Sequence, residues 1–261
     1  MARRNTLPTE GRLQPPRQRD LNARNVARTS LTEDRYAEVQ RVDRVFRRPL
    51  VGSDVQHLRP AGPVHDVDPR VGVVAIGPGL GRNKETQRGV LSFLKNYKNK
   101  KVIIDADGIF ALGNGRYKKL NLKNCVLTPH HSEFSTMIGV LSSELKKDIL
   151  KYGKAFVRRT SSYLILKGAP TIIFTPDGDA LINTTGNPAL AKFGTGDVLT
   201  GFLAGLLSQL NNTEKAIVTA VYIHSLAADL LAAKRTKLDI LASDIQNYIP
   251  QTIKFLENSI V

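Results

Sequence analysis

From Val71 onward, continuous apolar runs alternate with segments of helical periodicity, and this alternation restricts the possible folds more than any other feature of the sequence. Continuous apolar runs that end in Gly or polar residues are typical of strands buried on both faces of a parallel sheet. Such strands are expected at 71–76, 101–108, 125–130 and 163–168, and a hairpin at 171–185. Helices are expected at 83–98, from about Ser132, and at 143–160, 197–210, 214–235 and 242–258. The sequence therefore predicts an α/β fold in which helices cover both faces of an open, mostly parallel sheet.

The first seventy residues differ in composition from the rest of the chain. They contain 14 Arg with no Lys and no Ile, whereas residues 71–261 contain 6 Arg, 18 Lys and 17 Ile. A disordered basic tail would explain the Pro and charge content, and a wrong reading frame or fusion error would explain the abrupt change. We expect residues 1–70 to be a basic, Arg-rich segment that is disordered or non-native, and residues 71–261 to form the folded domain.

The overall charge and the cysteine content narrow the class of partner. A net charge of +15 fits either a solvated Lys-rich surface or an anionic partner. The absence of a nucleic-acid motif favours small phosphorylated molecules over DNA or RNA. Cys125 is the single cysteine, which excludes a disulfide framework and a Cys-based metal cluster and makes a cytoplasmic location the default. No apolar run approaches eighteen residues, so the sequence predicts no membrane span.

Four short polar or Gly-rich motifs follow the predicted strands. They are GPGLG at 77–81, DADG at 105–108, TPHHSE at 128–133 and KGAPT at 167–171. Ligands of open parallel sheets bind at the carboxyl ends of the strands, where these motifs are expected to meet.

Each of these motifs has a functional and a structural interpretation. The glycines allow a ligand to approach the backbone closely or simply form a tight turn, and Lys167 either holds a phosphate or lies exposed beside a turn. Asp105 and Asp107 are expected to cap the following turn or to act indirectly through water or Mg²⁺. The spacing around His130 and His131 does not match a zinc site, and a position at the end of a strand favours substrate contact.

The segment FGTGD at 193–197 carries the strongest functional signal. Gly194 and Gly196 flank Thr195, and a helix is expected to begin at about Asp197. Unpaired backbone amides at a helix start, together with the helix dipole, bind anions. A carboxylate beside such an anion site suits a general base that takes a proton from a hydroxyl attacking phosphorus, although a simple helix cap is the structural alternative.

Several of these motifs, in order, resemble those of the NAD(P)H-hydrate dehydratases, nucleotide-dependent repair enzymes of the ribokinase-like superfamily. The matching text is GPGLG, DADG, LTPHHSEF, LKGAPTII, TTGNPALAKFGTGDVLTG and YIHSLAADL, which together cover about 71–261. The resemblance implies a ribokinase-like fold and a hydro-lyase that restores NADH or NADPH from its 6-hydroxy hydrate. ADP or ATP would donate the phosphoryl group and Mg²⁺ would bridge the phosphates. The family often assembles as homo-oligomers.

The resemblance also implies roles for individual residues. Asp197 would take the proton of the 6-hydroxyl group, and phosphate would leave after the terminal phosphoryl group has moved to that oxygen. The residues implied to bind substrate are Gly79, Gly81, His130 and Asp197. The residues implied to bind the nucleotide are Lys167, Gly168, Ala169, Pro170, Thr171, Asn187, Gly194, Thr195 and Gly196. No residue is implied as a metal ligand.

The chain departs from the family pattern in several places. His131-Ser132 stands where Pro-Gly is usual, Lys192 and Phe193 are larger than usual, and Ser225 and Ala228 replace Gly. Residues 1–70 show no His-Lys-Gly motif and no Gly-Gly-Ser loop, so we expect the N-terminal strands of the sheet to be missing through truncation or a frame error. Re-reading the DNA in the other two frames would test that expectation.

Three alternatives stay open at this point. A ribokinase-like kinase of a thiazole or pyrimidine alcohol would share the anion site and the base, but its product would keep the phosphate. An inactive, truncated family member would keep the motifs without turnover. A basic nucleic-acid-binding protein would show salt-dependent DNA binding. The sequence does not choose between ADP and ATP.

Overall fold

One seven-stranded sheet organises the described part of the computed structural model, which covers residues 55–57, 71–96 and 100–259, all within the unit Val39–Val261. The strands follow one another across the sheet in chain order. They are β1 (Val55–His57), β2 (Val73–Ile76), β3 (Lys101–Ile104), β4 (Cys125–Leu127), β5 (Tyr163–Leu166), β6 (Thr171–Phe174) and β7 (Ala180–Asn183). Neighbouring strands from β1 to β5 are parallel. Strand β6 is antiparallel to both β5 and β7. The mostly parallel sheet and the hairpin are confirmed.

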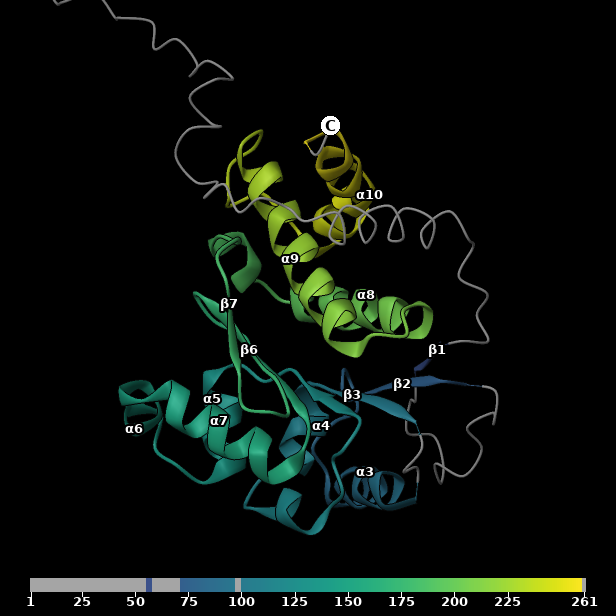
Figure 1. Cartoon of the computed structure of the whole chain (residues 1–261), viewed down its shortest axis with the longest axis vertical. Helices are drawn as coiled ribbons and strands as arrows, with labels where there is room; N and C mark the ends of the chain where they lie inside the picture. Colours follow the sequence, from purple (N-terminus) through teal and green to yellow (C-terminus); the bar gives the residue numbers. More distant parts are fainter. Residues whose placement is uncertain (1–54, 58–70, 97–99, 260–261) are drawn as a thin grey trace, which may run out of the picture. The chain divides into compact units, whose positions relative to one another are not determined.

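Helices cover both faces of this sheet, as the sequence predicts (Figure 1). One face carries α3 (Lys84–Asn96), α4 (Ala106–Ala111), α5 (His131–Ile138), α6 (Ser142–Lys147) and α7 (Ile149–Thr160). The other face carries α8 (Thr195–Gln209) and α9 (Thr213–Ala232), with α10 (Ala242–Ser259) packed on both. Two 3₁₀ turns, η1 (Arg116–Lys119) and η2 (Pro188–Ala191), complete the described elements.

The two helical layers exist because successive strand residues face opposite sides of the sheet. In β3, Val102 and Ile104 join the core beneath α3 to α7, whereas Ile103 joins the core beneath α8 and α9. All three side chains are buried. A strand that is buried on both faces must be apolar at every position, which is why these runs are continuous in the sequence.

Two predicted elements differ from the structure. The helix expected at 143–160 is two helices, because the backbone at Asp148 leaves the helical region and the Asp148 side chain caps α7 by accepting from the Lys151 amide. The strand expected at 101–108 ends at Ile104, and α4 begins two residues later. Gly108 makes this turn possible, since a Cβ there would lie 2.8 Å from the Ile76 carbonyl oxygen.

Helix α9 is long and apolar enough, by composition, to cross a membrane. However, 56% of its most apolar window is buried inside the fold. It contacts both α8 and α10, and Ala220 and Val221 belong to the core beneath the sheet. These contacts are those of a core helix.

Most of residues 1–70 lie outside the described residues, and so does the expectation that this segment is disordered or non-native. One strand does come from it: β1 pairs in parallel with β2, with Val55 opposite Val73. The sheet therefore has one described strand before β2.

Candidate active site

The carboxyl ends of β2 to β5 lie at one edge of the sheet because these strands are adjacent and parallel. The chain continues this pairing beyond β4 and β5. His130 and Lys167 form an isolated parallel bridge, and the Lys167 amide donates to the Pro129 carbonyl oxygen at 2.8 Å. The motifs that follow the four strands are thus brought together, as the sequence predicts.

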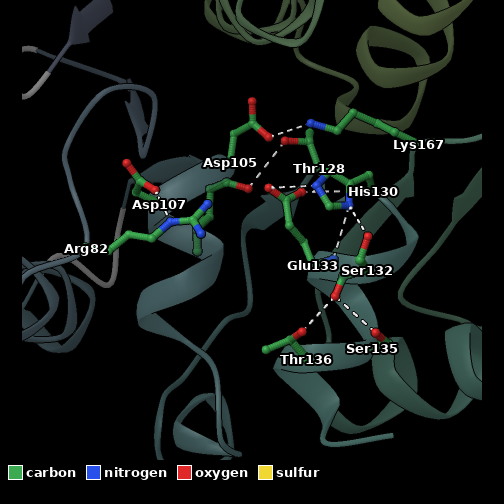
Figure 2. Close-up of polar contacts among 11 residues, drawn as sticks. Arg82, Asp105, Asp107, Thr128, His130, Ser132, Glu133, Ser135, Thr136 and Lys167 are labelled. Atoms are coloured by element: carbon green, nitrogen blue, oxygen red, sulfur yellow. Dashed lines mark hydrogen bonds and ion pairs between the residues drawn. The ribbon is translucent and has the colours of Figure 1, made fainter. Parts of the chain in front are cut away.

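Asp105 and Lys167 form the central ion pair of this edge (Figure 2). The Lys167 Nζ donates to Asp105 Oδ1 at 2.8 Å, and the Thr200 hydroxyl donates to Asp105 Oδ2 at 2.9 Å. The Asp105 side chain is 2% exposed and that of Lys167 is 24% exposed. Asp105 occupies the N-cap position of α4, but its side chain makes no capping hydrogen bond. Its carboxylate binds Lys167 and Thr200 instead of capping the turn.

Helix α8 begins next to that ion pair, and two of the backbone amides in its first turn are unpaired within the described structure. Its N-cap is Gly194 in the left-handed region (φ 85°), and no side chain caps it. The amides of Gly196 and Asp197 have no backbone acceptor among the described residues, whereas the Thr195 amide donates to the Lys192 carbonyl at 3.4 Å. A Cβ on Gly196 would lie 3.4 Å from Lys167 Nζ. Free amides, a helix N-terminus and a cation therefore converge on one small volume.

Asp197 lies in the first turn of α8, two residues further into the helix than expected. Its side chain is exposed and has no hydrogen-bond partner in the described part of the chain, so it does not act as a helix cap. Partial burial raises the pKa of Asp197, the charge of Asp105 raises it further, and Lys167 opposes both effects. An accessible carboxylate with a raised pKa beside unpaired amides has the features of a general base.

The GPGLG loop is fastened to the turn after β3 through Asp107. The Gly81 amide donates to Asp107 Oδ2 at 2.9 Å and Arg82 Nε donates to Asp107 Oδ1 at 2.7 Å. Gly79 and Gly81 are exposed, have positive φ, and have open space where a side chain would be. This arrangement leaves room for a ligand at the two glycines that the sequence singles out.

His130 caps α5 instead of standing free. Its Nδ1 accepts from the Glu133 amide at 3.2 Å, and the Glu133 carboxylate accepts from the His130 amide at 2.9 Å, which together make a capping box (Figure 2). The ring is 53% exposed, so substrate contact stays a prediction. The neighbouring His131 packs against Gly168, where a Cβ would lie 2.9 Å from His131 Nε2.

The predicted nucleotide-binding residues lie in two places. Gly168, Ala169 and Pro170 form an exposed turn after β5, and Thr171 begins β6. Asn187 lies at the start of η2, the short element that leads into α8. Its amide side chain is already engaged, because Oδ1 accepts from the Ala189 amide and Nδ2 donates to Asp229. Nucleotide binding by these residues stays a prediction.

Asp229 and Ser225 on α9 hold the loop that carries Asn187. Asp229 accepts from the Gly186 amide at 2.7 Å and from Asn187 Nδ2 at 2.8 Å. The Ser225 hydroxyl is 2.6 Å from that of Thr185 and accepts from Asn183 Nδ2 at 2.9 Å. Ser225, a departure from the family pattern, thus takes a defined place in this network.

The sequence alone predicts no role for Thr200, Asp229 or His224. Asp229 and His224 lie in the motif YIHSLAADL, which could have drawn attention to them. The motif does not show which residues they contact. Burial lowers the pKa of His224 to about 4, an effect that the backbone of Thr195 opposes. A neutral imidazole therefore packs beneath the first turn of α8.

Replacing Asp229 by Asn is expected to loosen the loop that precedes α8. The amide can accept only one of the two hydrogen bonds and sets its own NH2 group against the other donor, which should lower the melting temperature by about 5 °C and weaken ADP binding about tenfold. Calorimetric titration with ADP and a thermal melt check both effects. Asp177→Asn, a carboxylate substitution in the exposed β6–β7 turn, is the matched control, and equal behaviour of the two variants would contradict the assignment.

Comparison with known proteins places this geometry in a family. The family described as NAD(P)H-hydrate dehydratase matches residues 46–251. The chain belongs to the NAD(P)H-hydrate dehydratase family. The ADP-dependent (S)-NAD(P)H-hydrate dehydratase of Bacillus subtilis is 38% identical over 184 residues, which are 70% of this chain and 64% of that protein. The family match begins upstream of Val71, inside the segment of unusual composition.

Other family members extend the comparison. The bifunctional NAD(P)H-hydrate repair enzyme of Thermofilum pendens is 36% identical over 185 residues, which are 70% of this chain but only 35% of that enzyme. The crystal structure of the Bacillus subtilis ADP/ATP-dependent NAD(P)H-hydrate dehydratase, co-crystallized with ATP/Mg²⁺, superposes with a TM-score of 0.63 at 36% identity. That match covers 70% of this chain and 64% of that one. The chain therefore spans about a third of the bifunctional family members and under two thirds of the shorter ones.

Proposed function

We propose that this protein dehydrates the 6-hydroxy hydrate of NADH or NADPH and uses the terminal phosphoryl group of ADP or ATP to do so. The observation that carries the proposal is the exposed, unpartnered carboxylate of Asp197 beside the unpaired amides of Gly196 and Asp197. Family membership and the dehydratases that the chain resembles support the choice of substrate.

The chemistry follows from a base placed beside an anion site. Asp197 accepts the proton of the 6-hydroxyl group while that oxygen attacks the terminal phosphorus, and the bond to the departing nucleotide breaks. The two amides and Lys167 offset the charge that develops on the phosphoryl oxygens. The ring nitrogen then expels phosphate from C6, and loss of a proton from C5 restores the dihydronicotinamide.

The residues at the site fit Mg²⁺ held chiefly by phosphates. The described residues contain no cluster of three side chains able to form a metal cage. Asp105 is engaged by Lys167 and Thr200, and Asp107 by Arg82 and Gly81. Mg²⁺ commonly binds through phosphates and waters with few protein ligands, and it would neutralise part of the nucleotide's charge here.

A repair assay tests the proposal. NADPH hydrate is incubated with the full chain and either ADP or ATP, and both dihydronicotinamide absorbance and inorganic phosphate are followed. The proposal predicts that the absorbance returns with release of phosphate. A stable phosphorylated product would instead indicate a small-molecule kinase. A cytoplasmic location and a homo-oligomeric state stay predictions.

A further inference from the structure

The ionisable side chains of two aspartates, one lysine and one histidine lie near the start of α8. Asp105 comes from the end of β3 and Lys167 from the end of β5, while Asp197 belongs to α8 itself. His224 lies on α9, which packs against α8, and is neutral above about pH 4 because burial lowers its pKa. Among the described residues, Lys167 supplies the ammonium group whose charge acts on Asp197, and Asp105 supplies the competing carboxylate. The position of that ammonium group decides which carboxylate it stabilises.

The geometry places that ammonium group with Asp105. Lys167 Nζ lies 2.8 Å from Asp105 Oδ1, and the Thr200 hydroxyl fixes the other carboxylate oxygen at 2.9 Å. Asp105 is buried and has its second oxygen occupied, so the carboxylate cannot swing towards a different partner without losing a hydrogen bond. Asp197, in contrast, has no ion-pair partner among the residues described.

The ion pair lies against the backbone of the phosphate site. A Cβ on Gly196 would lie 3.4 Å from Lys167 Nζ and 3.9 Å from Asp105 Oδ2. An ammonium group at this position would be within reach of a phosphate that bound to the α8 amides. If it moved to Asp197 instead, it would favour the ionised carboxylate and weaken it as a base.

We propose that Asp105 is a positioning residue for the dehydration, holding Lys167 against the phosphate-binding backbone at Gly196 and away from the base Asp197. This inference rests on the proposed function for its reaction but not for its geometry. Removal of the Asp105 charge has two consequences with the same sign. Asp197 loses a neighbouring anion that disfavours its ionisation, and Lys167 is released to approach it.

Asp105→Asn is therefore expected to move the Asp197 titration to lower pH. Carbon-13 NMR of Asp-labelled protein reports that titration directly, with the Asp197 resonance assigned by its loss in Asp197→Asn. The acid limb of the kcat profile should move in the same direction, and ADP binding should weaken about tenfold as Lys167 loses its anchor. Thr200→Val keeps the Asp105 charge and should therefore shift the Asp197 titration less. Asp107→Asn removes a carboxylate that is paired with Arg82, and it should leave the Asp197 titration unchanged.

An unchanged or raised Asp197 titration in Asp105→Asn would overturn the proposal, as would unaltered ADP affinity. A fall in melting temperature without either change would mean that Asp105 is only structural. The NMR titration and ADP binding do not require turnover. If the wild-type chain failed to restore NADPH while both readouts moved as expected, the proposed function would fail and the positioning role would stand.

Discussion

Asp197→Asn is expected to restore NADPH from its hydrate about a thousandfold more slowly than the wild-type chain. An amide has nearly the shape of a carboxylate but cannot accept the hydroxyl proton. The Asp197 side chain makes no hydrogen bond to the described residues, so the substitution should leave the melting temperature almost unchanged. ADP affinity should hold or rise slightly, because an anion beside the phosphate site is removed.

The pH dependence gives this prediction a second readout. Burial and the charge of Asp105 raise the pKa of Asp197, so wild-type kcat should fall as the pH drops through that raised value and the base becomes protonated. The residual activity of Asp197→Asn should lack this limb. Asp177→Asn is the control for loss of one exposed carboxylate. An Asp197→Asn variant with wild-type kcat would exclude Asp197 as the base.

Gly77→Ala should cause the largest loss of stability among the single-methyl additions at this edge. A Cβ there would lie 1.8 Å from the Asp105 carbonyl oxygen, and φ at Gly77 is 136°, where only glycine is comfortable. The β2 loop and the turn after β3 would be forced apart. Urea denaturation should show a fall of about 3 kcal/mol in the free energy of unfolding, with loss of activity because Asp105 moves.

Two other glycines serve as controls for Gly77→Ala. Gly79 has a positive φ of 68° but open space around a new Cβ, so Gly79→Ala should cost only about 1 kcal/mol of left-handed strain. Gly72 has open space and no positive φ, and Gly72→Ala should change stability little. Equal unfolding midpoints for the three variants would show that the contact at Gly77 does not constrain the loop.

Sequence patterns predict the sheet and the edge at which the motifs meet, because buried parallel strands need continuous apolar runs. They could not place α4, which has six residues and too few turns to show a helical period. They also missed the break at Asp148, because the helical spacing continues across it while the backbone does not. Short elements and single-residue breaks are set by tertiary contacts that a local pattern does not contain.

The candidate site shows the same division. GTGD predicts the helix start and the carboxylate beside it, because the start of a helix and a side chain in its first turn are both local features. The pairing of Asp105 with Lys167 joins residues 62 positions apart, and Thr200 completes it from a third element. For Asp105 the sequence predicts a turn cap or an indirect role through water or Mg²⁺, because its partner Lys167 comes close only once β3, β5 and α8 pack together.

The most direct measurement is a stoichiometric assay of the full chain with ADP and NADPH hydrate, in parallel with Asp197→Asn. We expect the wild-type chain to release one inorganic phosphate for each NADPH restored, and the variant to form almost none of either product. Phosphate release without NADPH, or NADPH restored equally well by Asp197→Asn, would contradict it.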